Sequence, residues 1–210
     1  MMGIVNFGTF LAAGILLNLT PGNDTIFVLS KSMAQGRRAG IVSALGISSG
    51  CAVHTMLAAL GLSAIISKSI ILFNAVKYAG AAYLLYVGWK TMRDRTGIGA
   101  AISGRNERAP YLEIYRDALL TNVLNPKVAL FFLAFLPQFV APDTQDTFLP
   151  FLILGFVFVA TGTIWCFTLA VLASFISERL KNNVEISRVI NKICGAVLIV
   201  LGIKVALTDK

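Results

Sequence analysis

Long apolar stretches alternate with short polar segments along the whole chain. The pattern predicts six membrane segments, at residues 4–35, 41–66, 70–92, 111–140, 148–176 and 189–207. An α-helix needs about 20 apolar residues to cross a bilayer, so each segment is long enough. The first and fourth exceed that length and are expected to be tilted or broken. The sequence therefore predicts an all-α polytopic membrane protein with six transmembrane helices.

A polar motif interrupts the first segment at residues 18–24, which read Asn-Leu-Thr-Pro-Gly-Asn-Asp. Pro21 removes a backbone donor, Gly22 adds backbone freedom, and Asp24 places an ionisable group where lipid would otherwise be expected. A break of this kind is tolerated in a membrane mainly where it lines a cavity or is buried in protein. We therefore expect the first helix to be broken at Pro21, beside a polar site.

The fourth segment contains a similar interruption. Lys127 follows Pro126 in the middle of a stretch that is otherwise apolar from residue 118 to residue 140. Asn18 and Pro21 of the first segment are matched by Asn122 and Pro126 of the fourth. The sequence therefore predicts a second helix break at Pro126, equivalent to the first.

The third and sixth segments also match each other. Each has a lysine three residues before a glycine and, later, a glycine two residues before a lysine: Lys77, Gly80, Gly88 and Lys90 in one, Lys192, Gly195, Gly202 and Lys204 in the other. Because three crossings per half is an odd number, the two halves must enter the membrane from opposite sides. We predict two inverted repeats, residues 1–92 and 111–210, joined by a cytoplasmic linker at 93–110 into one transmembrane domain. Such repeats are characteristic of secondary transporters, whose substrate lies near the midplane between discontinuous helices.

The charged residues predict the orientation of these segments. The chain is 57% hydrophobic and 13% charged, with a mean hydropathy of +0.79 and a formal charge of +8. The basic residues form no stripe with interleaved aromatics, so nucleic acid is not an expected partner. Of the 18 Lys and Arg residues, 13 fall in the first, third and fifth connections. The positive-inside rule places these connections in the cytoplasm and both termini outside.

Asp24 is the only carboxylate predicted deep within the membrane, because the other nine acids fall in loops or near the ends of segments. An ionisable residue at such a position is by default a candidate for function. Burial favours its neutral form and a nearby cation favours its charged form, so its proton can leave and return with the substrate. Carbonyls freed by the prolines suit a cation, and helix N-termini suit an anion. The gap therefore resembles a site for a zwitterionic amino acid. Asp24 would bind the ammonium and Lys127 the carboxylate, with neutral partners at Asn18, Thr20, Asn23, Asn122 and Asn125.

Plainer interpretations of the same residues remain open. Asp24 could form a structural ion pair with Lys127 or cap the helix that restarts beside it, and the prolines could be simple kinks. The only histidine, His54, could relay protons, although a hydrogen bond to a neighbouring helix is the more common role. Close helix packing, within the protomer or in a dimer, explains the glycines of the second and fifth segments, which are Gly46, Gly50, Gly155 and Gly162.

The cysteines raise a different class of function. Cys51, Cys166 and Cys194 each lie alone in an apolar segment without a CxxC motif, so neither a metal site nor a disulfide framework is predicted. Cys51 and Cys166 occupy corresponding helices of the two halves and would allow a thiol relay, but neither adjoins a proline break in the sequence. A metal-cation exporter would need a cluster of acids, His or thiolates. No nucleophile with a base partner indicates an enzyme, and no cofactor is expected.

The chain resembles the LysE/RhtB family of bacterial amino-acid exporters in residues 18–25 (NLTPGNDT), 34–40 (AQGRRAG) and 121–127 (TNVLNPK), with the pair at 131–132 (FF). The resemblance covers the whole chain. The family commonly has Pro-Gly-Pro-Asp at the first motif, so Asn23 replaces a second proline, which favours a softer break and adds a side chain that could contact the substrate. The resemblance implies proton-linked export of an amino acid or derivative across the bacterial cytoplasmic membrane, and it is compatible with a homodimer. We expect proton antiport, in which Asp24 exchanges a proton for the substrate ammonium while one repeat rocks against the other.

Overall fold

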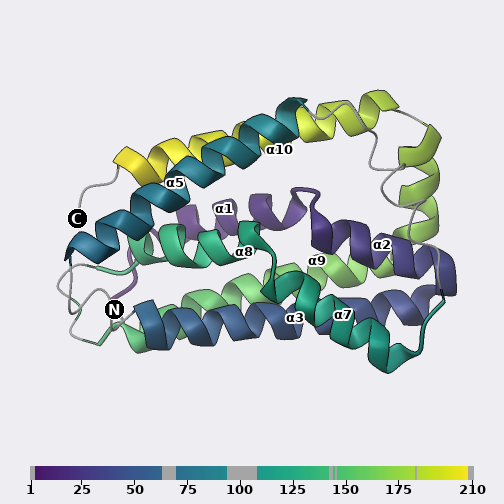
Figure 1. Ribbon diagram of the computed structural model, residues 1–210, viewed down its shortest axis with the longest axis horizontal. Helices are drawn as coiled ribbons and strands as arrows, with labels where there is room; N and C mark the ends of the chain where they lie inside the picture. The colour runs from purple at the N-terminus through teal and green to yellow at the C-terminus, as the bar shows by residue number, and fades with distance from the viewer. Residues whose placement is uncertain are drawn as a thin grey trace.

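The computed structural model describes residues 3–62, 70–93, 108–141, 144, 146–182 and 184–207. Residues 94–107 of the predicted linker lie outside these ranges. All regular elements in the described part of the chain are helical (Figure 1). In chain order they are α1 (Phe7–Leu19), α2 (Asn23–Gln35), α3 (Arg37–Leu57), the π-helical turn η1 (Ala58–Leu62), α5 (Ile70–Arg93), α7 (Tyr111–Val123), α8 (Pro126–Leu130), the π-helical turn η2 (Phe131–Phe135), the 3₁₀ turn η3 (Leu136–Phe139), α9 (Phe148–Asn182) and α10 (Val184–Leu207).

Two stretches are long and apolar enough to cross a membrane as single helices, Arg37–Gly61 and Phe148–Ala173. The pair Tyr111–Val123 and Pro126–Phe139 forms a third if its two parts, which meet at a bend of 44°, are counted as one span. The prediction of an all-helical, multi-pass membrane protein is therefore confirmed at this level.

Helical structure is interrupted in both the first and the fourth predicted segments. In the first, α1 ends at Leu19 and α2 begins at Asn23, and the N-cap residue Gly22 has an extended backbone. In the fourth, α7 ends at Val123 and α8 begins at Pro126. Proline is well suited to the first turn of α8, because that position of a helix needs no N–H donor.

The two interrupted segments run antiparallel to each other and are joined at both ends. At one end, Val5 N donates to Phe139 O at 2.9 Å and Ala141 N donates to Gly3 O at 2.8 Å. At the other end, the Gln35 side chain donates to Ala109 O at 2.9 Å and accepts from Ala109 N at 2.8 Å. The start of the first segment therefore lies against the end of the fourth, and the end of the first lies against the start of the fourth. Figure 1 places both chain termini at the same end of the molecule.

The remaining helices pack around these segments through small residues. α3 packs against both α7 and α9, and α5 packs along α10. A Cβ added at Gly46 or Gly50 would overlap the backbone of α7, and one at Gly155 would overlap the Thr55 side chain. The prediction that these glycines serve close helix packing is confirmed, and the contacts lie within one protomer.

A cluster of aromatic residues fills the core near the chain termini. Phe131 of η2 stacks on Phe158 of α9 with ring centroids 4.4 Å apart, and Phe135 meets Phe139 edge-on at 4.9 Å. Phe10 of α1 lies 5.3 Å from Phe139. All five rings are at most 3% exposed, so this end of the molecule is densely closed.

Candidate functional site

A small cavity lies beside the two interruptions. Its volume is about 40 Å³, and its walls come from α1, α2, α3, α7, α8 and α9. The polar side chains that line it include Asn18, Asp24, Ser48, Asn122, Lys127 and Thr163. A buried water needs about 10–15 Å³ of such space, so the cavity has room for about three water molecules. An amino acid would require it to widen.

The Asp24 carboxylate connects the two interruptions. Asp24 lies in the first turn of α2, where the helix dipole favours a negative charge. Its Oδ2 accepts a hydrogen bond from Asn122 Nδ2 at 2.9 Å, and its Oδ1 accepts one from Asn125 Nδ2 at 3.1 Å. Both donors belong to the other interruption, about 100 residues away in the sequence. The predicted proximity of Asp24, Asn122 and Asn125 is therefore present in the structure.

The Lys127 side chain reaches from the fourth segment to the end of α1. Its Nζ donates to Thr20 O at 3.0 Å and to Leu17 O at 3.3 Å. Pro21 has no N–H with which to bond the carbonyl four residues earlier, that of Leu17. That oxygen accepts from Thr20 N at 3.2 Å and keeps a lone pair for Lys127. Among the described residues, Lys127 and Asp24 form no ion pair, although both line the cavity. The alternative of a structural ion pair between them is therefore wrong for this conformation.

Pro126 has no N–H with which to bond the equivalent carbonyl, that of Asn122. That oxygen accepts from Asn125 N at 2.9 Å and from His54 Nε2 at 3.1 Å. A carbonyl oxygen can only accept, so Nε2 must carry the proton of this bond. The His54 ring, on α3, also stacks on Phe132 at 5.8 Å. The interpretation of His54 as a residue bonded to a neighbouring helix is therefore confirmed.

Asn18 holds α1 against α9 on the opposite side of the cavity. Its Nδ2 donates to Thr161 Oγ1 at 3.1 Å and to Phe158 O at 3.4 Å. A Cβ at Gly162 would lie 3.1 Å from Asn18 Oδ1, so the absence of a side chain there leaves space for the amide. Ser48 of α3 and Thr163 of α9 share a hydrogen bond of 2.7 Å on the same wall. The side chains of the cavity are thus fixed by bonds between helices.

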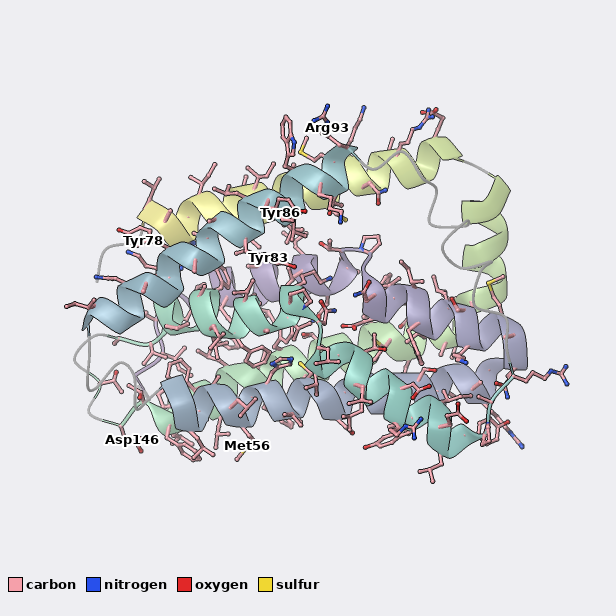
Figure 2. All side chains as sticks on the ribbon, in the orientation of Figure 1. Met56, Tyr78, Tyr83, Tyr86, Arg93 and Asp146 are labelled. Carbon is pink, nitrogen blue, oxygen red and sulfur yellow. The ribbon has the colours of Figure 1, made fainter. Side chains whose placement is uncertain are left out.

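A second, larger pocket of about 230 Å³ lies on the other side of the interruptions, against α5 and α10. Its polar lining includes Thr20, Asn23, Asn125 and Lys90, with Tyr83 and Tyr86 of α5 (Figure 2). Lys127 lines both this pocket and the cavity. Lys127 therefore separates the cavity, which contains Asp24, from the pocket, which is lined by Lys90 and Lys127.

The predicted site residues are divided between these two spaces. Asn18, Asp24 and Asn122 line the cavity, whereas Thr20, Asn23 and Asn125 line the pocket, together with the break residues Pro21, Gly22 and Pro126. Asn23 is an exposed residue, so it belongs to the mouth of the pocket.

The sequence reasoning missed several lining residues, chiefly Ser48, Thr163 and Trp165 in the cavity. A usable signal was present, because Thr161, Gly162 and Thr163 form a polar run in an otherwise apolar segment. Hydroxyl residues in membrane helices usually bond their own backbone, however, and Thr163 also does so.

The thiols lie closer to the interruptions than the sequence suggested. Cys51 and Cys166 both line the cavity that contains Asp24, and both are free thiols. Both thiols are therefore near the interruptions in space, although neither adjoins a proline break in the sequence. No group of three or more His, Cys, Asp or Glu side chains suited to a metal ion occurs in the described part of the chain.

Comparison with known proteins gives a consistent family. The sequence model of the family described as LysE type translocator matches residues 15–209. The chain is 29% identical to the uncharacterized membrane protein YrhP of Bacillus subtilis, over 95% of this chain and 97% of that protein. It is 30% identical to the leucine efflux proteins of Salmonella choleraesuis and Salmonella typhimurium, over 94% of this chain and 92% of theirs. No solved structure matches.

Proposed function

The chain belongs to the LysE-type translocator family, and from this premise we propose that it is a secondary transporter that exports an amino acid or an amino-acid derivative from the cytoplasm. Membership of a transporter family also confirms the prediction that the chain is not an enzyme. Relatives named leucine efflux protein make leucine the first substrate to test.

The single observation that carries the proposal is the position of Asp24. Among the described residues it is the only carboxylate that lines the cavity, and it lies where two antiparallel interrupted segments meet. Its oxygens are held by two amides from the opposite segment, and each oxygen keeps capacity for a further donor. A substrate ammonium or a proton could bind to these oxygens, and either one would neutralise the charge of Asp24.

We propose that the chain crosses the bacterial cytoplasmic membrane six times, as two inverted repeats with both termini outside. The antiparallel pairing of the two interrupted segments supports the inversion. Large apolar side chains on the outer face of α9, such as Phe156 at 71% and Ile164 at 67% exposed, are expected to contact lipid. The corner between α2 and α3, with Arg37 and Arg38, would lie in the cytoplasm.

Proton antiport would result if the Asp24 carboxylate binds either a proton or the substrate ammonium, but not both at once. Facing outwards, Asp24 would release the substrate ammonium and take a proton from outside. Facing inwards, it would release that proton to the cytoplasm and bind a new ammonium. The cavity must widen to admit an amino acid, and the closed aromatic end must open to release it, which is the rocking of one repeat against the other.

The second pocket would serve as a vestibule on the cytoplasmic side. Lys90 lies one turn from the end of α5, and Lys127 forms the wall towards the cavity. The described lining of the pocket contains two cations and no carboxylate, so it would attract the substrate carboxylate rather than its ammonium. Lys127 could then exchange a carbonyl of α1 for this carboxylate as the substrate enters.

The experiment that tests this function is efflux from liposomes preloaded with labelled leucine, at neutral internal pH and with acidic or neutral external buffer. We expect the wild-type protein to export leucine faster when the outside is acidic, because protons then move inwards. Asp24→Asn should fold and lose the dependence on the pH gradient. Leucine efflux by Asp24→Asn at the wild-type rate against a leucine gradient would show that Asp24 does not couple transport.

A further inference from the structure

Two buried polar atoms at the cavity have no hydrogen-bond partner among the described residues. They are Asn122 Oδ1, an acceptor, and Trp165 Nε1, a donor. Both residues line the cavity, and Asn122 is only 2% exposed. Buried polar atoms are nearly always satisfied, so an acceptor and a donor left over at one small cavity indicate that something else bonds them there.

The Asn122 oxygen cannot be turned to another partner without losing a bond. Its Nδ2 donates to Asp24, and the Asn122 backbone oxygen accepts from His54. α3 also packs tightly against this residue, because a Cβ at Gly50 would lie 2.8 Å from Asn122 Cβ. The amide is therefore fixed from three directions, and its oxygen lies beside the carboxylate that its own nitrogen binds.

The Trp165 indole supplies the opposite chemistry. Its N–H can only donate, and no acceptor in the described part of the chain bonds it. The rest of the cavity wall near these polar groups is apolar and includes Leu17, Ile47, Val128 and Val159. The cavity thus combines acceptors for a cation, an unpartnered buried donor for an anion, and apolar surface for a side chain.

We propose that Trp165 and Asn122 contact the transported substrate, an α-amino acid with an aliphatic side chain. The indole N–H donates to the substrate carboxylate, and Asn122 Oδ1 accepts from its ammonium beside Asp24. The inference rests on the function proposed above, because it places the substrate in this cavity. A basic side chain finds no second carboxylate among the described lining residues, so the site selects neutral amino acids. Without substrate, the roughly three waters that the cavity can hold bond the same atoms.

The test uses the fact that the chain contains two tryptophans, Trp89 and Trp165. Trp165→Phe keeps an aromatic ring and removes the N–H. We expect the KM for leucine efflux to rise about tenfold or more, the loss expected for a hydrogen bond to a charged group. Leucinol, which has no carboxylate, should inhibit leucine efflux with the same inhibition constant in the wild-type and Trp165→Phe proteins. Trp89→Phe is the matched control, because Trp89 is exposed on α5 beside Arg93.

A second measurement reports directly on the indole. In the Trp89→Phe protein all tryptophan emission comes from Trp165, so leucine should change that emission in a saturable manner and leucinol should not. Equal weakening of leucine and leucinol in Trp165→Phe would assign Trp165 to packing and overturn the proposal. An unchanged KM for leucine in that variant would also overturn the proposed role of Trp165, but it would leave the proposed transport function intact. Absence of leucine efflux in the wild-type protein would instead contradict the function on which the proposal rests.

Discussion

The ammonium of Lys127 lies 3.0 Å from the carbonyl oxygen of Thr20, so a side chain from one interruption closes the end of the helix in the other. The same principle applies to both prolines. Because neither proline has an N–H to donate, Lys127 can bond the Leu17 carbonyl and His54 can bond the Asn122 carbonyl. Each carbonyl also accepts one backbone N–H from the residue three positions later. The carbonyls expected to bind a substrate cation are thus bonded by the protein's own side chains in this conformation.

Replacement of Lys127 by methionine should abolish leucine efflux and lower thermal stability. Methionine has a similar length but no donor, so the carbonyls of Leu17 and Thr20 would lose their ammonium partner inside the protein. A buried acceptor left without a donor costs about 1–3 kcal/mol. The measurement is efflux from liposomes together with the melting temperature in detergent. Arg93→Met, at the exposed end of α5, should change neither, and full efflux by Lys127→Met would remove Lys127 from the transport path.

Gly22→Ala should reduce efflux with little effect on folding. The backbone at Gly22 is extended, with φ of −164°, so alanine introduces no backbone strain. Its Cβ would lie 3.2 Å from Lys127 Nζ, and the ammonium would have to shift. Gly8→Ala in α1 is the control, because a Cβ there has no neighbour within 4 Å. Equal efflux rates for the two variants would mean that the position of the ammonium does not matter.

The outline of the site could be predicted from the sequence because its signals are local. Proline, glycine and a lone carboxylate inside an apolar run identify Asp24 and the interruption at Pro21 without any knowledge of the fold. The matching polar run at Pro126 predicts the second interruption in the same way. What could not be predicted is which groups bond to which, because these contacts join residues about 100 positions apart.

Helix ends and the cavity wall were harder to predict for a different physical reason. α9 continues to Asn182 and α10 begins at Val184. The hydropathy pattern instead predicts that the fifth segment ends at residue 176 and that the sixth begins at residue 189. Polar residues such as Glu185 and Arg188 are good helix formers, so a helix can continue past its apolar part. Trp165 has no local feature that distinguishes a cavity residue from a packing residue.

His54→Gln should retain proton-coupled efflux with the wild-type dependence on external pH. His54 donates to a backbone carbonyl and stacks on Phe132, and it is not part of the cavity lining. A glutamine amide can also donate, but it lacks the ring, so we expect a loss of stability of about 1 kcal/mol and no loss of coupling. Asp24→Asn is the comparison that should lose coupling. A shifted pH profile in His54→Gln would restore the proton-relay interpretation.

Gly88→Ala should destabilise the pairing of α5 with α10. A Cβ at Gly88 would lie 2.7 Å from the carbonyl oxygen of Gly195, so the two helices would have to separate. Because the obstacle is backbone, we expect a cost of about 1–3 kcal/mol, measured as a lower melting temperature. The same substitution at Gly8, which has no close neighbour, should be neutral or stabilising because alanine favours the helix. An unchanged melting temperature in Gly88→Ala would contradict the close approach of these helices.

A variant without cysteines, with alanine at positions 51, 166 and 194, should export leucine with the wild-type dependence on the pH gradient. Cys51 and Cys166 line the cavity, but a thiol relay would require both sulfurs, whereas transport requires only the space around them.

Restoring Cys166 alone then provides a probe of the cavity. Because Cys166 is 6% exposed, a maleimide should modify it slowly, and leucine should slow the reaction further by occupying the cavity. Restoring Cys194 alone is the control, because Cys194 lies on α10 and lines neither the cavity nor the pocket. If the variant without cysteines lost efflux while keeping its melting temperature, the thiols would have a chemical role and the relay would regain support.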